Sequence, residues 1–183
     1  MAATPKVLLT GRPGIGKTTL IRRFLASVQV QAGGFYTEEI RRGGERLGFS
    51  LNLLSGPRYV LASVEIAGRW HVGKYGVDVR TFESATVPEI ESAIAQNRLV
   101  VVDEIGKMEL FSERFQEAVR RALDSPAAVL GTILSRPHPF ADGIRRRRDV
   151  TILEVTPANR DRLPLELPRL FGLQVMNRNA SQV

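Results

Sequence analysis

Residues 11–18 combine glycines, a lysine and a threonine at a spacing that suits a phosphate group. They match G-x-x-x-x-G-K-[ST] and comprise Gly11, Arg12, Pro13, Gly14, Ile15, Gly16, Lys17 and Thr18. Glycines let backbone N–H groups surround a phosphate, because no Cβ stands in the way. The lysine can reach the terminal phosphates of a nucleotide, and the threonine hydroxyl can ligate Mg²⁺. We therefore predict a phosphate loop, with the adjoining Thr19 among its nucleotide contacts.

Two adjacent carboxylates, Asp103 and Glu104, follow the apolar run of residues 99–102. A parallel strand would carry them to the sheet edge where open α/β sheets bind ligands. Asp103 is then expected to hold Mg²⁺, directly or through water. Glu104 would orient or deprotonate an attacking water, as general bases do. Two acids at a strand end are common alone, but beside a phosphate loop they indicate metal-dependent chemistry on a nucleoside triphosphate.

Lys107 and Arg136 are weaker candidates for contacts with the phosphates. Lys107 could reach the γ-phosphate, form a pair with Glu109 or be a surface lysine. Arg136 follows a predicted strand and could sense the transferred phosphate. The arginines of residues 145–148 could form a lid that supplies a catalytic arginine, or the solvated face of a helix.

The segment after the last predicted strand contains three further candidates for nucleotide contacts: Thr156, Asn159 and Arg160. They could contact the base or ribose of a nucleotide. Alternatively, Thr156 could cap a helix, since threonine is a favoured N-cap residue.

Strands and helices alternate around these motifs. Apolar runs predict strands at residues 7–10, 99–103, 127–134 and 150–155. Helical spacing of apolar residues predicts helices at residues 18–28, 88–96, 112–125 and 160–171. Strands that are apolar on both faces indicate a mostly parallel sheet covered on both sides.

Residues 33–80 predict an antiparallel β insertion at one edge of that sheet. Residues 35–41 and 47–54 flank Gly43 and Gly44, and residues 59–66 and 70–79 flank Gly68. Residues 68–74 repeat the glycine and lysine spacing of the phosphate loop. Tyr75 follows where a metal-ligating hydroxyl is needed, so we interpret this segment as a β-turn.

The composition fits one globular domain, expected over residues 1–173, with residues 174–183 as a flexible tail. The chain has 183 residues and no cysteine, which excludes disulfides and thiolate chemistry; its only histidines are His71 and His138. We expect a cytoplasmic monomer with no membrane-spanning segment or signal peptide. The net charge of +7 favours anionic partners.

Five segments give the chain a more specific resemblance: residues 11–20, 33–40, 72–79, 103–110 and 155–160. In them it resembles the small P-loop nucleoside-triphosphatases first described in thermophiles. The resemblance implies a three-layer sandwich with a RecA-like or kinase-like P-loop core. It also implies Mg²⁺-dependent hydrolysis of ATP, GTP, CTP and UTP to the diphosphate and phosphate.

Two other functions stay open. A nucleoside or nucleotide kinase would use the same loop, Mg²⁺ and acid, with an acceptor in place of water. A nucleic-acid-binding role would use the basic charge, but the arginine run lacks the interleaved aromatic residues that stacking requires. We therefore do not expect nucleic acid to be the primary partner.

Overall fold

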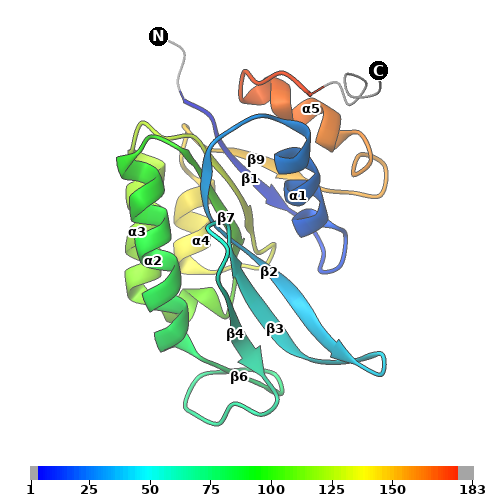
Figure 1. Ribbon diagram of the computed structural model, residues 1–183, viewed down its shortest axis with the longest axis vertical. Helices are drawn as coiled ribbons and strands as arrows, with labels where there is room; N and C mark the ends of the chain where they lie inside the picture. Colours follow the sequence, from blue (N-terminus) through cyan, green and yellow to red (C-terminus); the bar gives the residue numbers. More distant parts are fainter. Residues whose placement is uncertain (1–3, 177–183) are drawn as a thin grey trace.

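The computed structural model describes residues 4–176, and its strands form one mixed sheet (Figure 1). The strands are β1 (Lys6–Thr10), β2 (Ala32–Arg42), β3 (Glu45–Leu53), β4 (Arg58–Ser63), β5 (His71–Val72), β6 (Tyr75–Val77), β7 (Leu99–Ile105), β8 (Val129–Ile133) and β9 (Thr151–Glu154). Their order across the sheet is β5-β6-β4-β3-β2-β7-β8-β1-β9. One strand, β8, therefore separates the phosphate-loop strand β1 from the acidic strand β7.

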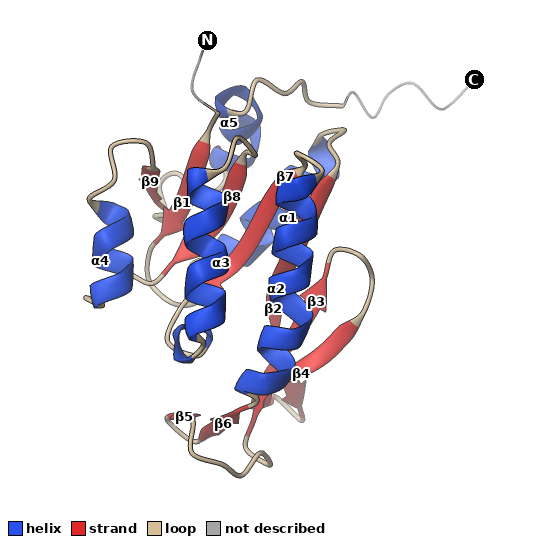
Figure 2. Cartoon of the chain, turned by 90° about the vertical axis from the view of Figure 1, so that its left-hand side faces the viewer, coloured by secondary structure: helices blue, strands red, loops and turns tan. Residues whose placement is uncertain are grey.

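Helices cover both faces of the sheet, which explains the strands that are apolar on both sides. The helices are α1 (Lys17–Ser27), α2 (Val79–Ala95), the 3₁₀ helix η1 (Glu109–Phe111), α3 (Glu113–Asp124), α4 (Pro139–Arg145) and α5 (Leu163–Leu170). One apolar cluster packs α1 and α5 on the sheet, and the other packs α2, α3 and α4 on the opposite face (Figures 1 and 2). The predicted three-layer α/β fold is confirmed.

The strand β2 joins the parallel and antiparallel parts of the sheet. Its first residues pair in parallel with β7, from Ala32 opposite Leu99 to Phe35 opposite Val102. From Phe35 onward, β2 pairs antiparallel with β3. The turn that joins the two strands contains Gly43 and Gly44, with φ of 56° and 83°. The insertion is thus an extension of the central sheet, and it begins within β2.

Two predicted elements differ from those observed, and one helix was not predicted. Residues 70–79 were expected as one strand, but β5 and β6 form a hairpin whose turn has Gly73 at φ 59°. The helix expected at residues 88–96 begins at Val79, because the Asp78 carboxylate accepts from Thr81 N at 2.9 Å and caps the helix. The sequence interpretation also missed α4, which starts at a proline after the capping side chain of His138.

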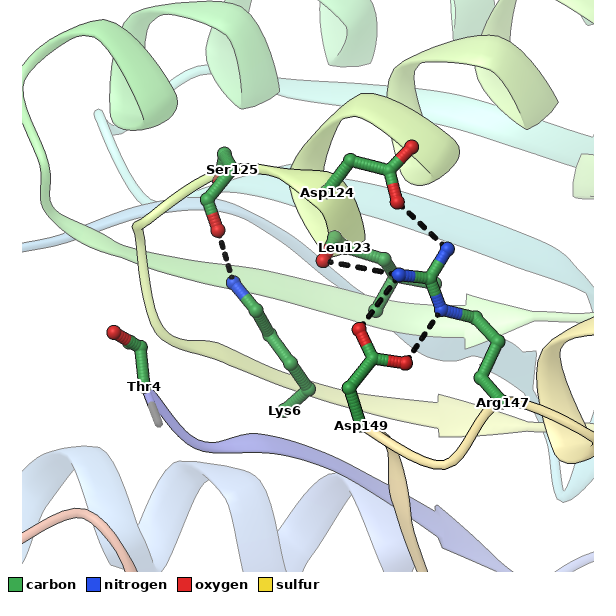
Figure 3. Close-up of a pocket in the computed structure, with 7 residues that line it drawn as sticks. All are labelled: Thr4, Lys6, Leu123, Asp124, Ser125, Arg147 and Asp149. Atoms are coloured by element: carbon green, nitrogen blue, oxygen red, sulfur yellow. Dashed lines mark hydrogen bonds and ion pairs between the residues drawn. The ribbon is translucent and has the colours of Figure 1, made fainter. Parts of the chain in front are cut away.

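A charged cluster, shown in Figure 3, lies at the start of β1, whose other end leads into the predicted phosphate loop. Lys6, at the start of β1, donates to the backbone oxygens of Ala122 at 3.3 Å and Ser125 at 2.8 Å, and also to that of Ala127. Arg147 pairs with Asp124 at 2.7 Å and Asp149 at 2.6 Å. The two cations therefore bond backbone oxygens at and just beyond the C-terminal end of α3, with Arg147 donating to Leu123 O. The 300 Å³ cavity here is therefore part of a helix cap.

The chain end packs on α1, where Val175 bridges to Val28 and Met176 N donates to Ser27 O at 2.8 Å. Of the tail predicted at residues 174–183, residues 174–176 are described and include these contacts, and residues 177–183 lie outside the described residues. Within residues 4–176, no helix is both long and apolar enough to cross a membrane.

Candidate active site

The predicted phosphate loop connects β1 to α1, so a strand leads in and a helix leads out. Gly11 has φ 141°, and a Cβ built there would lie 2.6 Å from Val155 O, so only glycine fits. Gly14 and Gly16 have φ of 76° and 105°, with no atom near the position of a Cβ. Within the described chain no side chain caps α1 at Gly16. The first N–H groups of this helix are therefore available to an anion.

Lys17 lies across this loop. It is half-buried, and its Nζ donates to Gly11 O at 3.1 Å. The amine thus bonds the first residue of its own loop, and an incoming phosphate could replace this carbonyl oxygen. Ile15 anchors the loop because its side chain is buried, whereas Arg12, Pro13 and Thr19 are exposed.

Asp103 is the most buried acid of the site, with 1% of its surface exposed. One oxygen, Oδ1, accepts from Thr132 Oγ1 at 2.7 Å. The other, Oδ2, has no hydrogen-bond partner among the described residues. Burial raises the pKa of Asp103, and the hydroxyls of Thr18 and Thr132 and the charge of Lys17 counteract this rise. A buried carboxylate oxygen without a partner is costly unless a cation or ligand satisfies it.

These residues fit a magnesium ion. In phosphate-binding sites Mg²⁺ keeps several waters and takes one or two protein oxygens plus those of the substrate. Asp103 supplies a free oxygen, and the Thr18 hydroxyl lies close enough to lower the pKa of that carboxyl group. Within residues 4–176 there is no cluster of three or more His, Cys, Asp or Glu side chains suited to a metal. Any ion here would depend on substrate and water for its remaining ligands.

Glu104 is half-buried between charges of opposite sign. Burial raises its pKa, the charge of Lys17 lowers it and the charge of Asp103 raises it again. The net effect is a raised pKa, which makes the carboxylate a stronger base than an exposed glutamate.

Glu109 lies beside Glu104 and was missed as a site residue. A Cβ built on Gly106 would lie 2.9 Å from Glu109 Oε2 and 3.2 Å from Glu104 Cδ, so both carboxyl groups adjoin one side of Gly106. Glu109 is 5% exposed, and burial together with Glu104 raises its pKa to about 8. Of the alternatives left open for Lys107, a pair with Glu109 does not form within the described residues, since Lys107 is exposed while Glu109 is buried.

The segment after β9 lies beside the phosphate loop, as the close approach of Val155 to Gly11 shows. Within it, Asn159 Oδ1 accepts from Thr156 N at 2.8 Å, and Asn159 Nδ2 donates to Glu154 O at 2.8 Å. Asn159 therefore shapes the turn with its own amide, while Arg160 is exposed.

The arginines proposed to contact the phosphates divide into an exposed residue and residues held in structural contacts. Arg136 is exposed on the loop between β8 and α4. Arg145 pairs with Asp142 at 2.6 Å and donates to Leu134 O, and Arg147 belongs to the α3 cap. Both Arg145 and Arg147 are therefore committed to structural contacts.

Thr132 and Thr10 were also missed. Thr132 is a single hydroxyl in the apolar strand β8, and this break in the pattern could have marked it. The Thr10 hydroxyl, at the end of β1, is buried without a partner in the described chain. Only the pairing of β8 with β7 places Thr132 beside Asp103.

A glycine loop between a parallel strand and a helix, with an acid pair on the second strand away in the sheet, is the arrangement expected of an α/β protein of the phosphate-loop class. Residues 6–167 match the profile of the family described as NTPase. The nucleoside-triphosphatase THEP1 of Thermotoga maritima is 42% identical over 177 residues, covering 97% of this chain and 99% of that protein. The human cancer-related nucleoside-triphosphatase is 43% identical over 173 residues, covering 86% and 91% respectively.

Solved structures agree with this assignment. The crystal structure of THEP1 from the hyperthermophile Aquifex aeolicus has a TM-score of 0.84 at 36% identity, over 91% of this chain and 98% of that one. The solution structure of the human protein has a TM-score of 0.78 at 41% identity, over 91% of this chain and 96% of that one. The chain belongs to the NTPase family, as its sequence segments predicted, and is an enzyme of the nucleoside-triphosphatase class.

Proposed function

We propose that the protein hydrolyses ATP, GTP, CTP and UTP to the diphosphate and phosphate in a Mg²⁺-dependent reaction. The observation that carries the proposal is the buried Asp103, whose free Oδ2 lies near Lys17 and Thr18 at the mouth of a glycine loop. A triphosphate in the loop would bring both the phosphates and the cation that this arrangement lacks.

In the proposed mechanism, backbone N–H groups of residues 11–18 and the Lys17 amine bind the β- and γ-phosphates. Thr18 and Asp103 would hold Mg²⁺, which neutralises phosphate charge. Glu104 accepts a proton from a water molecule, and the oxygen of that water attacks the γ-phosphorus. The bond from that phosphorus to the β–γ bridging oxygen breaks, and the diphosphate leaves with the electron pair. The raised pKa of Glu104 supports its role as the base.

The direct test is steady-state phosphate release from the four triphosphates, with and without Mg²⁺. We expect release from all four, loss of release with a chelator, and loss of turnover in Lys17→Ala. Arg169→Ala is a suitable control, since Arg169 is an exposed residue of α5. Wild-type turnover in Lys17→Ala would contradict the phosphate-loop assignment.

The kinase alternative uses the same residues and needs an acceptor. Running the assay with candidate nucleosides and nucleotides separates the two functions, because a kinase forms phosphorylated acceptor in excess of free phosphate. The cytoplasmic location and the monomeric state stay predictions.

A further inference from the structure

A second cavity, of about 380 Å³, lies between the β5–β6 hairpin, the segment that joins β7 to α3, and the start of α4. Its volume is within the range of small-molecule sites, about 300–1,000 Å³. Two segments that carry the family resemblance, residues 72–79 and 103–110, contribute to its walls. None of the proposed steps of triphosphate hydrolysis uses this cavity.

Part of the cavity wall is polar and rich in donors. It contains Lys107 and both histidines of the chain, His71 and His138. His138 Nδ1 accepts from Phe140 N at 3.3 Å, so the neutral ring carries its proton on Nε2. Lys107 adds three N–H donors and a positive charge. Among the described residues, none that line the cavity is acidic. An anion suits this wall better than a cation does.

The rest of the wall, apart from Gly73, is apolar and aromatic. It consists of Val72, Leu110 and Phe111. Phe111 packs on Trp70, the only tryptophan of the chain, with ring centroids 4.8 Å apart and planes inclined at 31°. A ligand that fills this cavity therefore needs an apolar, preferably planar part beside its negative charge.

Both the hairpin and the segment around Leu110 are held in place by contacts with neighbouring residues. Tyr75 of the hairpin is buried, packs edge-on against Phe49 and accepts from Arg46 Nε at 3.0 Å. On the other side, Leu110 N donates to Gly106 O at 3.0 Å, and Leu110 O accepts from Gln116 Nε2 at 2.9 Å. A preformed cavity of this kind binds a ligand with little loss of protein entropy.

We infer that this cavity binds a small phosphate monoester that carries a planar ring, of the nucleoside monophosphate class. The phosphate lies against Lys107 and the two imidazoles, and the ring lies against Phe111 and its apolar neighbours. The inference goes beyond triphosphate hydrolysis, since it assigns a second binding site that shares the Glu104–Lys107 segment with the acid pair.

The distribution of reporter residues makes the test specific. Both histidines line the cavity and the sole tryptophan stacks on its aromatic wall. In the full chain carrying Lys17→Ala, which weakens the phosphate loop, AMP is titrated and the two histidine ring C–H signals are followed by NMR. We expect both signals to move along one binding curve, and the Trp70 fluorescence to change with it. Signals that stay fixed at millimolar AMP would overturn the inference.

Variants and partial ligands test the chemistry of the site. In that background Lys107→Ala should weaken AMP binding about tenfold, as expected for one charge-assisted hydrogen bond. Arg169→Ala, which also removes one positive charge, should leave the affinity for AMP unchanged. His138→Asn keeps a side chain able to cap α4 but loses the Nε2 donor, so it should weaken binding several-fold. Equal effects of Lys107→Ala and Arg169→Ala, or ribose 5-phosphate binding as tightly as AMP, would overturn the assignment.

Discussion

At the scale of single residues, Glu104 combines a raised pKa with a position next to the buried Asp103. Glu104→Gln is nearly isosteric, so the fold and the phosphate loop should persist, but the amide cannot accept the proton of water. We expect kcat to fall by about 10²–10⁴-fold, the usual value of a general base. The affinity for Mg²⁺-ATP, measured by equilibrium binding, should stay within a few-fold. Wild-type turnover would show that Glu104 is not the base and would shift attention to Arg136.

Asp103 should act through the metal. Asp103→Asn replaces a charged oxygen ligand with a neutral one, so a higher Mg²⁺ concentration should be needed for half-maximal activity. A Mg²⁺ titration of phosphate release at saturating ATP measures this change. An unchanged midpoint would exclude Asp103 as the metal partner.

Glu109 should make stability depend on pH. Its pKa is about 8 in the folded protein, against an ordinary value of 4.5. Between these values the folded state holds a proton that the unfolded chain has lost. The contribution of Glu109 to stability is therefore fully present below the ordinary pKa and is lost as the pH rises through the folded one.

Glu109→Gln removes this titration while keeping the shape of the side chain. Urea unfolding at about pH 5 and about pH 8 should therefore show a smaller loss of stability for the variant than for the wild type. Some loss should persist, because burial also raises the pKa of Asp103 and Glu104. Equal losses in both proteins would mean that Glu109 does not hold its proton near neutral pH.

At the scale of elements, α3 is defined by contacts at both ends. Ser112 Oγ accepts from Phe115 N at 2.9 Å at its start, and Lys6 donates to backbone oxygens at its end. The Ser112 and Ser125 boundaries were predicted from the sequence and are confirmed. The cap by Lys6 was not predicted, because it joins residues more than 110 positions apart.

Lys6→Met should destabilise the protein without changing its catalytic chemistry. The variant removes the hydrogen bonds that the Lys6 amine donates to three backbone oxygens, at a cost of about 2–3 kcal/mol. For a protein of this size that corresponds to a Tm lower by roughly 4–12 °C. Thermal unfolding measures the loss, and kcat at a temperature where the variant is folded should match the wild type. A Tm equal to that of Arg169→Ala would refute the cap.

At the scale of the whole molecule, the continuous sheet couples the insertion to the phosphate-loop region. β2 pairs with β7 at one end and with β3 along its length, so neither part can unfold without exposing the other's strand edge. We expect one cooperative transition, with Trp70 fluorescence from the insertion and far-UV circular dichroism giving the same midpoint. Mg²⁺-ATP added to Glu104→Gln at about 100 times its Kd should raise both midpoints together, through about 2.7 kcal/mol of binding energy. Separate midpoints would indicate two domains.

Local patterns in the sequence determined most of the parallel core. The glycine loop, the apolar runs before and after it, and the serines flanking α3 each act over a few residues, so spacing alone locates them. The same logic failed where two local signals competed. Pro88 resembles a helix start, yet it lies inside α2, because Asp78 supplies the cap that begins the helix at Val79.

The environment of each functional group was decided by the tertiary structure alone. Thr132 reaches Asp103 because β8 inserts between β1 and β7, an order that no local pattern encodes. Glu109 is buried beside Glu104 only because η1 folds back over Gly106. His71 and His138 meet at one cavity although 66 residues separate them in the chain. The sequence by itself determined which chemical groups the protein carries. Burial and strand order, which depend on contacts between distant segments, decided which oxygens lack partners and which carboxyl groups hold protons.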